Sequence, residues 1–181
     1  GVFSQTPRRR GGGPAAGLEE TVVLSVGTIE PRKNHLGLLA ALAEARRLRP
    51  DLKIRLVLAG ACHSPELRAK VAVAMEALGG VEWRENADDA LLARLYEDCD
   101  FTAYPSPAEG FGLPVLESIW YGRPAVCHEV SSLREVAAGG GCRSGRLGAE
   151  PAPPWSGLAP HVRDARAQRA VFGGCPAAPG G

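Results

Sequence analysis

The chain has 181 residues, of which 45% are hydrophobic and 23% are charged, and its formal net charge is +1. This length suffices for one globular domain with a core but not for two full domains. No apolar run approaches the roughly 20 residues that span a bilayer, so we expect no transmembrane segment. The balance of acidic and basic residues argues against a general nucleic-acid-binding surface, so any anion site must be local.

The five cysteines are widely separated and include no Cys-x-x-Cys pair. This pattern is typical neither of a disulfide framework nor of a structural metal site. We therefore expect no bound metal and a reducing compartment, the cytoplasm. Residues 1–20 contain three consecutive arginines and lack an apolar segment of signal-peptide length, which predicts a linker or the end of an upstream region.

The first predicted unit is a strand followed by a helix. Thr21–Val26 is an apolar, β-rich run that ends at Gly27, as a buried strand does. After a predicted loop at residues 28–34, residues 35–49 carry leucines at helical spacing and stop at Pro50. The sequence thus begins with one β-α unit.

The same alternation continues along the chain. Ser64 and Pro65 supply an N-cap and a first helical residue, and Pro114 and Gly122 bracket a later helix. Further strands are predicted at residues 54–59, 81–83, 100–104 and 125–127, and helices at residues 65–78, 88–97, 112–121 and 132–137. Five strands alternating with helices predict a doubly wound parallel α/β sheet, which binds ligands at the carboxyl edge of its strands.

The predicted Rossmann-like domain covers residues 21–141. Residues 142–181 follow as a tail in which 21 of the 40 residues are Gly, Pro or Ala, so we expect it to be irregular and poorly ordered. This composition is also what a GC-rich gene yields in a shifted reading frame. The nucleotide sequence near the codons for residues 139–142 would test that hypothesis.

Residues 105–117 follow a predicted strand and open a predicted helix. Gly110 and Gly112 allow close backbone approach, and the free amides at the start of the helix favour a phosphate group. Glu109 and Glu117 flank this point, where two carboxylates beside a diphosphate would accept hydrogen bonds from neutral hydroxyl groups. A sugar nucleotide supplies both kinds of group. The alternatives are a tight turn that requires glycine and a helix start with acids that suit its dipole.

The loop after the first strand carries the second candidate. Arg32 and Lys33 would neutralise a diphosphate held at Gly110, because both loops leave the same edge of the sheet. The alternative is a solvated basic pair on the surface.

With these motifs the sequence resembles the retaining group 1 glycosyltransferases of GT-B architecture, specifically their C-terminal nucleotide-sugar-binding domain. The resemblance covers about residues 22–138, and its most specific part is Glu-Gly-Phe-Gly-Leu-Pro at residues 109–114. The other segments that carry it are residues 25–35, 58–60, 92–96, 104–106, 122–124 and 131–136. The fold that the resemblance implies is the C-terminal half of a GT-B enzyme.

The resemblance also implies roles for individual residues. Glu117 would hold the ribose hydroxyls, Glu109 would face the donor hexose, and Lys33 would bind the diphosphate, so that Glu109 and Lys33 are the candidate catalytic residues. Arg32 is a weaker donor-binding candidate, because Thr28 stands where many relatives have an arginine. The backbone amides expected to contact the sugar or diphosphate are those of Gly110, Phe111, Gly112 and Leu113.

By the same resemblance, the nucleobase would lie against residues 84–87. The implied reaction transfers a hexosyl group, with mannosyl as one candidate, from a nucleotide diphosphate sugar with retention and without a required metal or other cofactor. A glycan or lipid-linked acceptor would be bound by an N-terminal domain that these residues do not contain, and that domain could bring the protein to a membrane periphery. The isolated chain would bind donor weakly and transfer nothing.

Two alternatives from other classes stay open. The chain could be a non-catalytic nucleotide-binding module or an inactive truncated fragment, which the upstream coding sequence would decide. A response-regulator-like signalling domain would need an acidic cluster after the first strand, whereas residues 28–34 are basic.

His35 is interpreted as the start of a helix, and Tyr96, Trp83 and Trp120 as packing residues.

Overall fold

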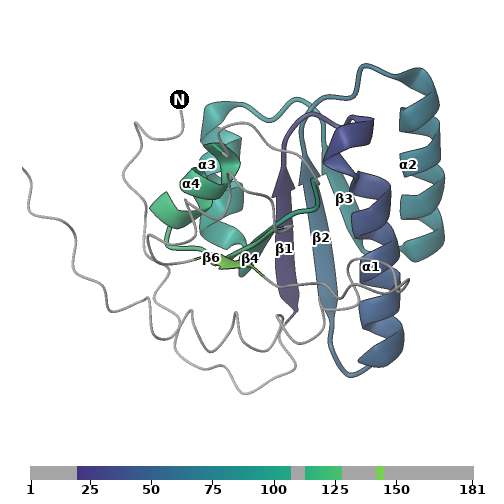
Figure 1. Ribbon diagram of the computed structural model, residues 1–181, viewed down its shortest axis with the longest axis horizontal. Helices are drawn as coiled ribbons and strands as arrows, with labels where there is room; N and C mark the ends of the chain where they lie inside the picture. Colours follow the sequence, from purple (N-terminus) through teal and green to yellow (C-terminus); the bar gives the residue numbers. More distant parts are fainter. Residues whose placement is uncertain (1–19, 107–112, 128–141, 145–181) are drawn as a thin grey trace, which may run out of the picture.

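The computed structural model describes residues 20–106, 113–127 and 142–144, and the structural statements below refer to these residues. The elements follow one another as strands, one short 3-10 helix and four α-helices (Figure 1). In chain order they are β1 (Thr21–Val26), η2 (Pro31–Lys33), α1 (His35–Leu48), β2 (Ile54–Ala59), α2 (Pro65–Leu78), β3 (Val81–Arg84), α3 (Asp89–Asp98), β4 (Phe101–Tyr104), α4 (Leu113–Trp120), β5 (Ala125–Cys127) and β6 (Cys142–Ser144).

The strands form one parallel sheet in the order β3-β2-β1-β4-β5-β6. This confirms the predicted doubly wound, Rossmann-like fold. The strand order reverses between β1 and β4, so the carboxyl ends of these two strands form the topological switch point at which such sheets bind ligands. The expected ligand edge is therefore fixed by the topology.

The sixth strand was not predicted. Residues 142–144 were assigned to an irregular tail, but their backbone pairs in parallel with β5, with Ala125 opposite Cys142. A three-residue edge strand is held by backbone hydrogen bonds and needs no apolar periodicity, so the sequence carries no signal for it. The sheet thus continues past residue 141, and the predicted helix at residues 132–137 lies outside the described residues.

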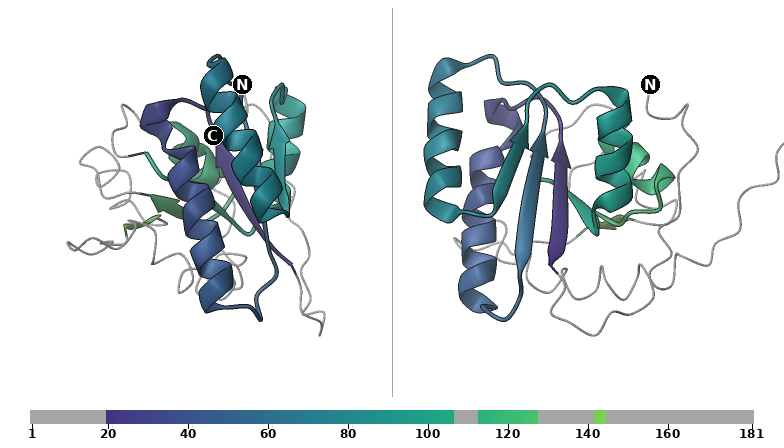
Figure 2. Two further views of the ribbon diagram at one scale, coloured as in Figure 1. Left: turned by 90° about the vertical axis from the view of Figure 1, so that its right-hand side faces the viewer. Right: turned by 180° about the vertical axis from the view of Figure 1, so that it is seen from behind.

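Helices cover both faces of the sheet (Figures 1 and 2). α1 and α2 pack on one face, where Leu38 and Leu42 meet Val23 and Leu56 in a buried apolar cluster. α3 packs on the other face in a second cluster, which includes Leu24, Val57, Ala59, Ala93 and Tyr96. Successive strand residues therefore serve opposite cores, as expected for a parallel sheet that is buried on both faces.

Side-chain caps set the beginnings of α2 and α3. Ser64 Oγ accepts a hydrogen bond from the Leu67 amide at 3.2 Å, as its predicted N-cap role requires. Asp88 Oδ1 accepts one from the Leu91 amide at 2.7 Å, so Asp88 caps α3 instead of forming its first residue. The predicted loop at residues 28–34 contains the short helix η2, which begins at Pro31. Among the described helices, none has the length and apolar character needed to cross a membrane.

Candidate functional site

The two loops that carry the candidate residues meet at the switch point. β1 and β4 pair directly, with Val23 opposite Phe101, so the loops that follow them leave the same edge of the sheet. Ser106 Oγ, just after β4, donates a hydrogen bond to the Arg32 carbonyl oxygen at 3.1 Å. The loop of Arg32 and Lys33 (residues 28–34, the basic loop) and the loop that begins after β4 (the helix-entry loop) therefore leave one edge of the sheet, which confirms the expectation.

The backbones just past the ends of β1 and β2 are in close contact. A Cβ atom on Gly60 would lie 2.1 Å from the carbonyl oxygen of Gly27, a distance that no side chain allows. A Cβ atom on Gly27 would lie 3.9 Å from Cε of Lys33, so the Lys33 side chain extends over the end of β1. The structure thus places the Lys33 cation at the carboxyl edge, next to the switch point.

Arg32 is oriented differently from its neighbour. Its guanidinium Nη2 forms a 2.6 Å ion pair with Glu30 Oε1, and its side chain is 56% exposed. An anion at this edge would compete with Glu30 for Arg32, because the guanidinium is already paired. The donor-binding role of Arg32 stays a prediction.

Only part of the helix-entry motif lies in the described residues. Leu113 is the first residue of α4 and is exposed, whereas Glu117 lies one turn further along and is half-buried. The other candidate residues, Glu109, Gly110, Phe111 and Gly112, fall outside the described residues. Their roles therefore stay predictions, and so does the pairing of the two glutamates.

Glu117 points toward α3. Its Oε2 accepts a hydrogen bond of 2.8 Å from the Tyr96 hydroxyl. Burial raises the pKa of Glu117, the Tyr96 hydrogen bond acts in the opposite direction, and the charge of Asp89 raises the pKa further. Sequence reasoning assigned Tyr96 to packing, which is true of its fully buried ring but misses the bond made by its hydroxyl. No spacing rule would have revealed that contact.

Two charged residues of the predicted nucleobase contact, Arg84 at the end of β3 and Glu85 after it, have protein partners. Arg84 forms a 2.7 Å ion pair with Glu82, and Glu85 pairs with Arg68. The Arg68 guanidinium also lies over the Trp83 ring, 5.0 Å from its centroid. Contact between the loop after β3 and a nucleobase stays a prediction, and these pairings favour backbone groups for that contact.

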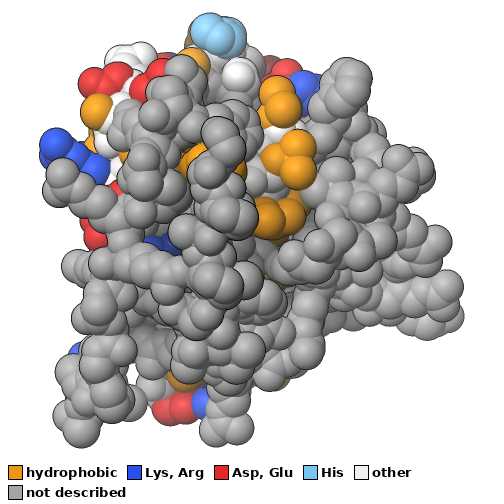
Figure 3. Space-filling view, turned by 90° about the vertical axis from the view of Figure 1, so that its left-hand side faces the viewer, with side chains coloured by type: hydrophobic (Ala, Val, Ile, Leu, Met, Phe, Trp, Pro, Cys, Tyr) orange, Lys and Arg blue, Asp and Glu red, His pale blue; other side chains and the backbone are white. Residues whose placement is uncertain are grey.

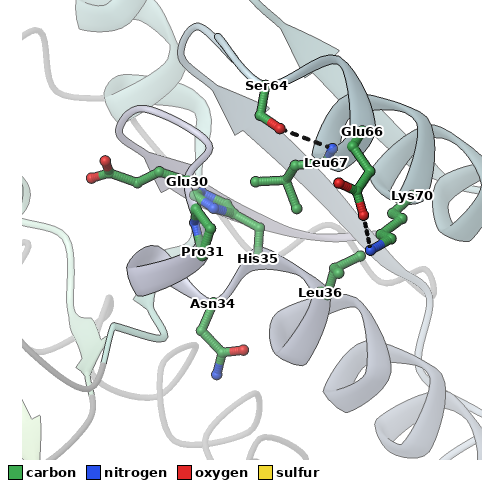
Figure 4. A pocket seen from close by; sticks show the side chains of 9 residues that line it. All are labelled: Glu30, Pro31, Asn34, His35, Leu36, Ser64, Glu66, Leu67 and Lys70. Atoms are coloured by element: carbon green, nitrogen blue, oxygen red, sulfur yellow. Dashed lines mark hydrogen bonds and ion pairs between the residues drawn. The ribbon is translucent and has the colours of Figure 1, made fainter.

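A cavity of about 330 Å³ lies between the first turns of α1 and α2 (Figure 4). Its lining includes Glu30, Asn34, His35, Glu66 and Lys70. His35 is 4% exposed, and its Nδ1 has no hydrogen-bond partner among the described residues. Burial, reinforced by the charge of Lys33, lowers the pKa of His35 to about 4, so the ring is neutral at pH 7. As predicted, His35 is the first residue of a helix.

The outer surface of α4 is apolar. Leu113, Leu116 and Trp120 are 57%, 39% and 51% exposed. Hydrophobic side chains gather on the face of the molecule that carries α3 and α4 (Figure 3). Trp120, interpreted from the sequence as a packing residue, is therefore half-exposed, because it occupies the outward side of its helix.

Comparison with known proteins identifies the family. A family model described as "Glycosyl transferases group 1" matches residues 14–157. The chain belongs to this family. The resemblance inferred from the motifs is thereby confirmed.

Curated relatives carry names of the same class. The chain is 35% identical over 121 residues to a D-inositol 3-phosphate glycosyltransferase from Segniliparus rotundus, covering 66% of the chain and 27% of the relative. It is 34% identical over 119 residues to the O-antigen chain mannosyltransferase B of Escherichia coli, covering 65% of the chain and 31% of the relative. A serotype-specific mannosyltransferase, WbdA of Escherichia coli, is 31% identical over 63% of the chain and 14% of its own length. The chain thus spans about a third or less of these group 1 relatives.

Solved structures show the same fold. HepE of Anabaena, in complex with UDP and glucose, superposes with a TM-score of 0.67 at 20% identity over 85% of the chain and 41% of its own length. An α,α-trehalose-phosphate synthase from Burkholderia xenovorans gives a TM-score of 0.69 at 12% identity, over 85% of the chain and 39% of its own length. This group 1 chain therefore has the Rossmann-like fold of one half of a GT-B glycosyltransferase.

Proposed function

We propose that this chain is the donor-binding domain of a glycosyltransferase. The complete enzyme would transfer a hexosyl group from a nucleotide diphosphate sugar to an acceptor, with retention of anomeric configuration. The observation that carries the proposal is the bond between Ser106 and Arg32, because it joins the basic loop to the helix-entry loop at the switch point. Membership of the group 1 family supports the same function.

The proposed roles follow from charge and position. Lys33, which extends over the end of β1, would offset the negative charge that develops on the departing diphosphate. Glu117 would accept hydrogen bonds from ribose hydroxyls through the oxygen capacity that Tyr96 leaves open. The remaining candidate residues would contact the hexose or the diphosphate of the donor. They are Arg32, Glu109, Gly110, Phe111, Gly112 and Leu113.

A mannosyl donor is the first candidate for the sugar. Two of the curated relatives are named mannosyltransferases, which supports mannose, and HepE was solved with UDP and glucose, which supports a nucleotide-linked hexose in general. The proposed chemistry needs no metal, since Lys33 and the helix amides supply the positive charge. A glycan or lipid-linked acceptor would bind to a further domain, in the cytoplasm or at the periphery of a membrane.

Calorimetric titration of the chain with UDP- and GDP-linked glucose and mannose tests the proposal. We expect weak but saturable binding of at least one donor, and Lys33→Ala should lower its affinity about tenfold, as expected for a charge-assisted contact. Lys53→Ala is the matched control, because Lys53 is exposed just before β2 at the opposite edge of the sheet. Equal affinities for the two variants would contradict the proposed site.

A further inference from the structure

The contact between Tyr96 and Glu117 joins α3 to the candidate site. The Tyr96 hydroxyl has a single proton and three acceptors within reach: Glu117 Oε2 at 2.8 Å, the Pro114 carbonyl at 3.4 Å and the Tyr104 hydroxyl at 3.4 Å. The carboxylate is the nearest of the three and the only charged one, so the Tyr96 O–H donates its hydrogen bond to Glu117 Oε2. The Tyr96 hydroxyl is therefore the hydrogen-bond donor to the Glu117 carboxylate.

Tyr96 is itself held in one orientation. Its ring stacks on Tyr121 with centroids 5.2 Å apart and an interplanar angle of 7°. Its backbone carbonyl accepts a 2.8 Å hydrogen bond from Nε of Arg123. Because the ring is fully buried, the hydroxyl oxygen cannot move away from the Glu117 carboxylate. The Tyr96 hydroxyl is thus held at a fixed position beside the Glu117 carboxylate.

The fixed Tyr96 hydroxyl restricts the conformation of the Glu117 side chain. A glutamate side chain has three rotatable bonds, and freezing them when a ligand arrives lowers the affinity. A carboxylate accepts about four hydrogen bonds through its two oxygens, so the bond from Tyr96 leaves acceptor capacity for ribose hydroxyls. The contact therefore orders the Glu117 side chain before the ligand binds and still leaves its carboxylate able to accept further hydrogen bonds.

We propose that Tyr96 is a positioning residue that holds the Glu117 carboxylate ready for the two ribose hydroxyls of the donor. This inference rests on the proposed function, in which Glu117 holds the ribose. The competing interpretation is a purely structural bond that fastens α3 to α4. The two differ in one respect: a positioning residue affects only ligands that carry the hydroxyls.

The test compares Tyr96→Phe with the unchanged chain. Each would be titrated with UDP and GDP and with their 2′,3′-dideoxy counterparts. We expect Tyr96→Phe to bind the better ribonucleotide about five- to tenfold more weakly and to bind the dideoxy form as the unchanged chain does. Combined with Glu117→Ala, Tyr96→Phe should have no additional effect on affinity.

Tyr104→Phe is the matched control. It removes another buried phenol hydroxyl, one that donates to the Pro114 carbonyl at 2.8 Å and not to Glu117. We expect it to leave the ratio of ribonucleotide to dideoxynucleotide affinity unchanged. If Tyr96→Phe does not fold, Tyr121→Leu carries the same test, because it removes the ring that stacks on Tyr96 and should lower the same ratio while Glu117 is unchanged.

The outcomes separate the two levels of the proposal. If the unchanged chain binds both nucleotide forms equally, Glu117 does not hold the ribose, and both the proposed role and this inference are overturned. If the unchanged chain prefers the ribonucleotide and Tyr96→Phe keeps the same preference, only the positioning role of Tyr96 is overturned. Loss of the preference in Tyr96→Phe and not in Tyr104→Phe supports the inference.

Discussion

The hydroxyl oxygen of Ser106 and the carbonyl oxygen of Arg32 lie 3.1 Å apart, although 74 positions separate the two residues in the sequence. The bond fastens the loop after β1 to the loop after β4. It spans the point at which the sheet reverses its strand order, where a parallel sheet leaves room for a ligand. The position of Lys33 relative to α4 therefore depends in part on this bond.

Ser106→Ala should weaken donor binding as well as stability. Loss of the bond to Arg32 releases the loop that carries Lys33, so we expect nucleotide-sugar affinity to fall about threefold or more, with about 1 kcal/mol lost from the free energy of unfolding. Calorimetric titration and urea denaturation measure the two effects.

Ser64→Ala is the control for this prediction. Ser64 caps α2, and its replacement should cost a similar amount of stability, about 1 kcal/mol, without affecting donor affinity. A greater loss of affinity in Ser64→Ala than in Ser106→Ala would move the binding site to the cavity of Figure 4, which Ser64 lines.

Gly60→Ala should be strongly destabilising. The added methyl group would meet the Gly27 carbonyl, and Gly60 also has a φ of +151°, so we expect a loss of about 3 kcal/mol or more. Gly79→Ala is the comparison, because Gly79 has a φ of +63° but a Cβ added there would meet no atom within 4 Å, and it should cost only about 1 kcal/mol. Urea denaturation followed by tryptophan fluorescence measures both. Equal losses of stability in the two variants would contradict the close contact between Gly60 and the Gly27 carbonyl.

Most of this architecture could be predicted from the sequence, because apolar runs, N-caps and glycines act locally. Thr21–Val26 and Ile54–Ala59 are strands with the predicted bounds. The unpredicted features depend on residues far apart in the chain or on backbone geometry. Tyr96 and Glu117 meet only because α3 and α4 pack on one face, and at Gly37, inside α1, a Cβ would lie 2.6 Å from the side-chain amide of Asn34.

His35 should make the stability of the domain depend on pH. Its pKa is lowered to about 4 in the folded state from an ordinary value of 6.5, so the unfolded state binds more protons between these values. The free energy of unfolding should therefore be highest above about pH 7 and fall by about 3 kcal/mol as the pH drops to 4. Denaturation curves across this range measure the slope.

His35→Gln should remove that part of the slope, because glutamine does not titrate. Val73→Ala, which changes an exposed residue that does not titrate, should leave the slope as it is in the unchanged chain. If His35→Gln and the unchanged chain lose equal stability on acidification, the buried ring is not the source of the pH dependence.

Removal of divalent metal should leave donor binding unchanged. The proposed diphosphate site uses Lys33 and helix amides for its positive charge. Titration in the presence of EDTA, compared with titration in added Mg²⁺, measures the effect. An affinity that collapses in EDTA would count against a site built from protein cations alone.

The most direct measurement is a ¹⁵N–¹H correlation spectrum of the labelled chain, recorded during titration with GDP-mannose and UDP-glucose. The largest shift changes are expected at the carboxyl edge, in residues 27–34, 104–106 and 113–117. Changes confined to residues 49–53 at the opposite edge, or to the cavity lined by Ser64 and Lys70, with Lys33 and Glu117 unaffected, would contradict this expectation.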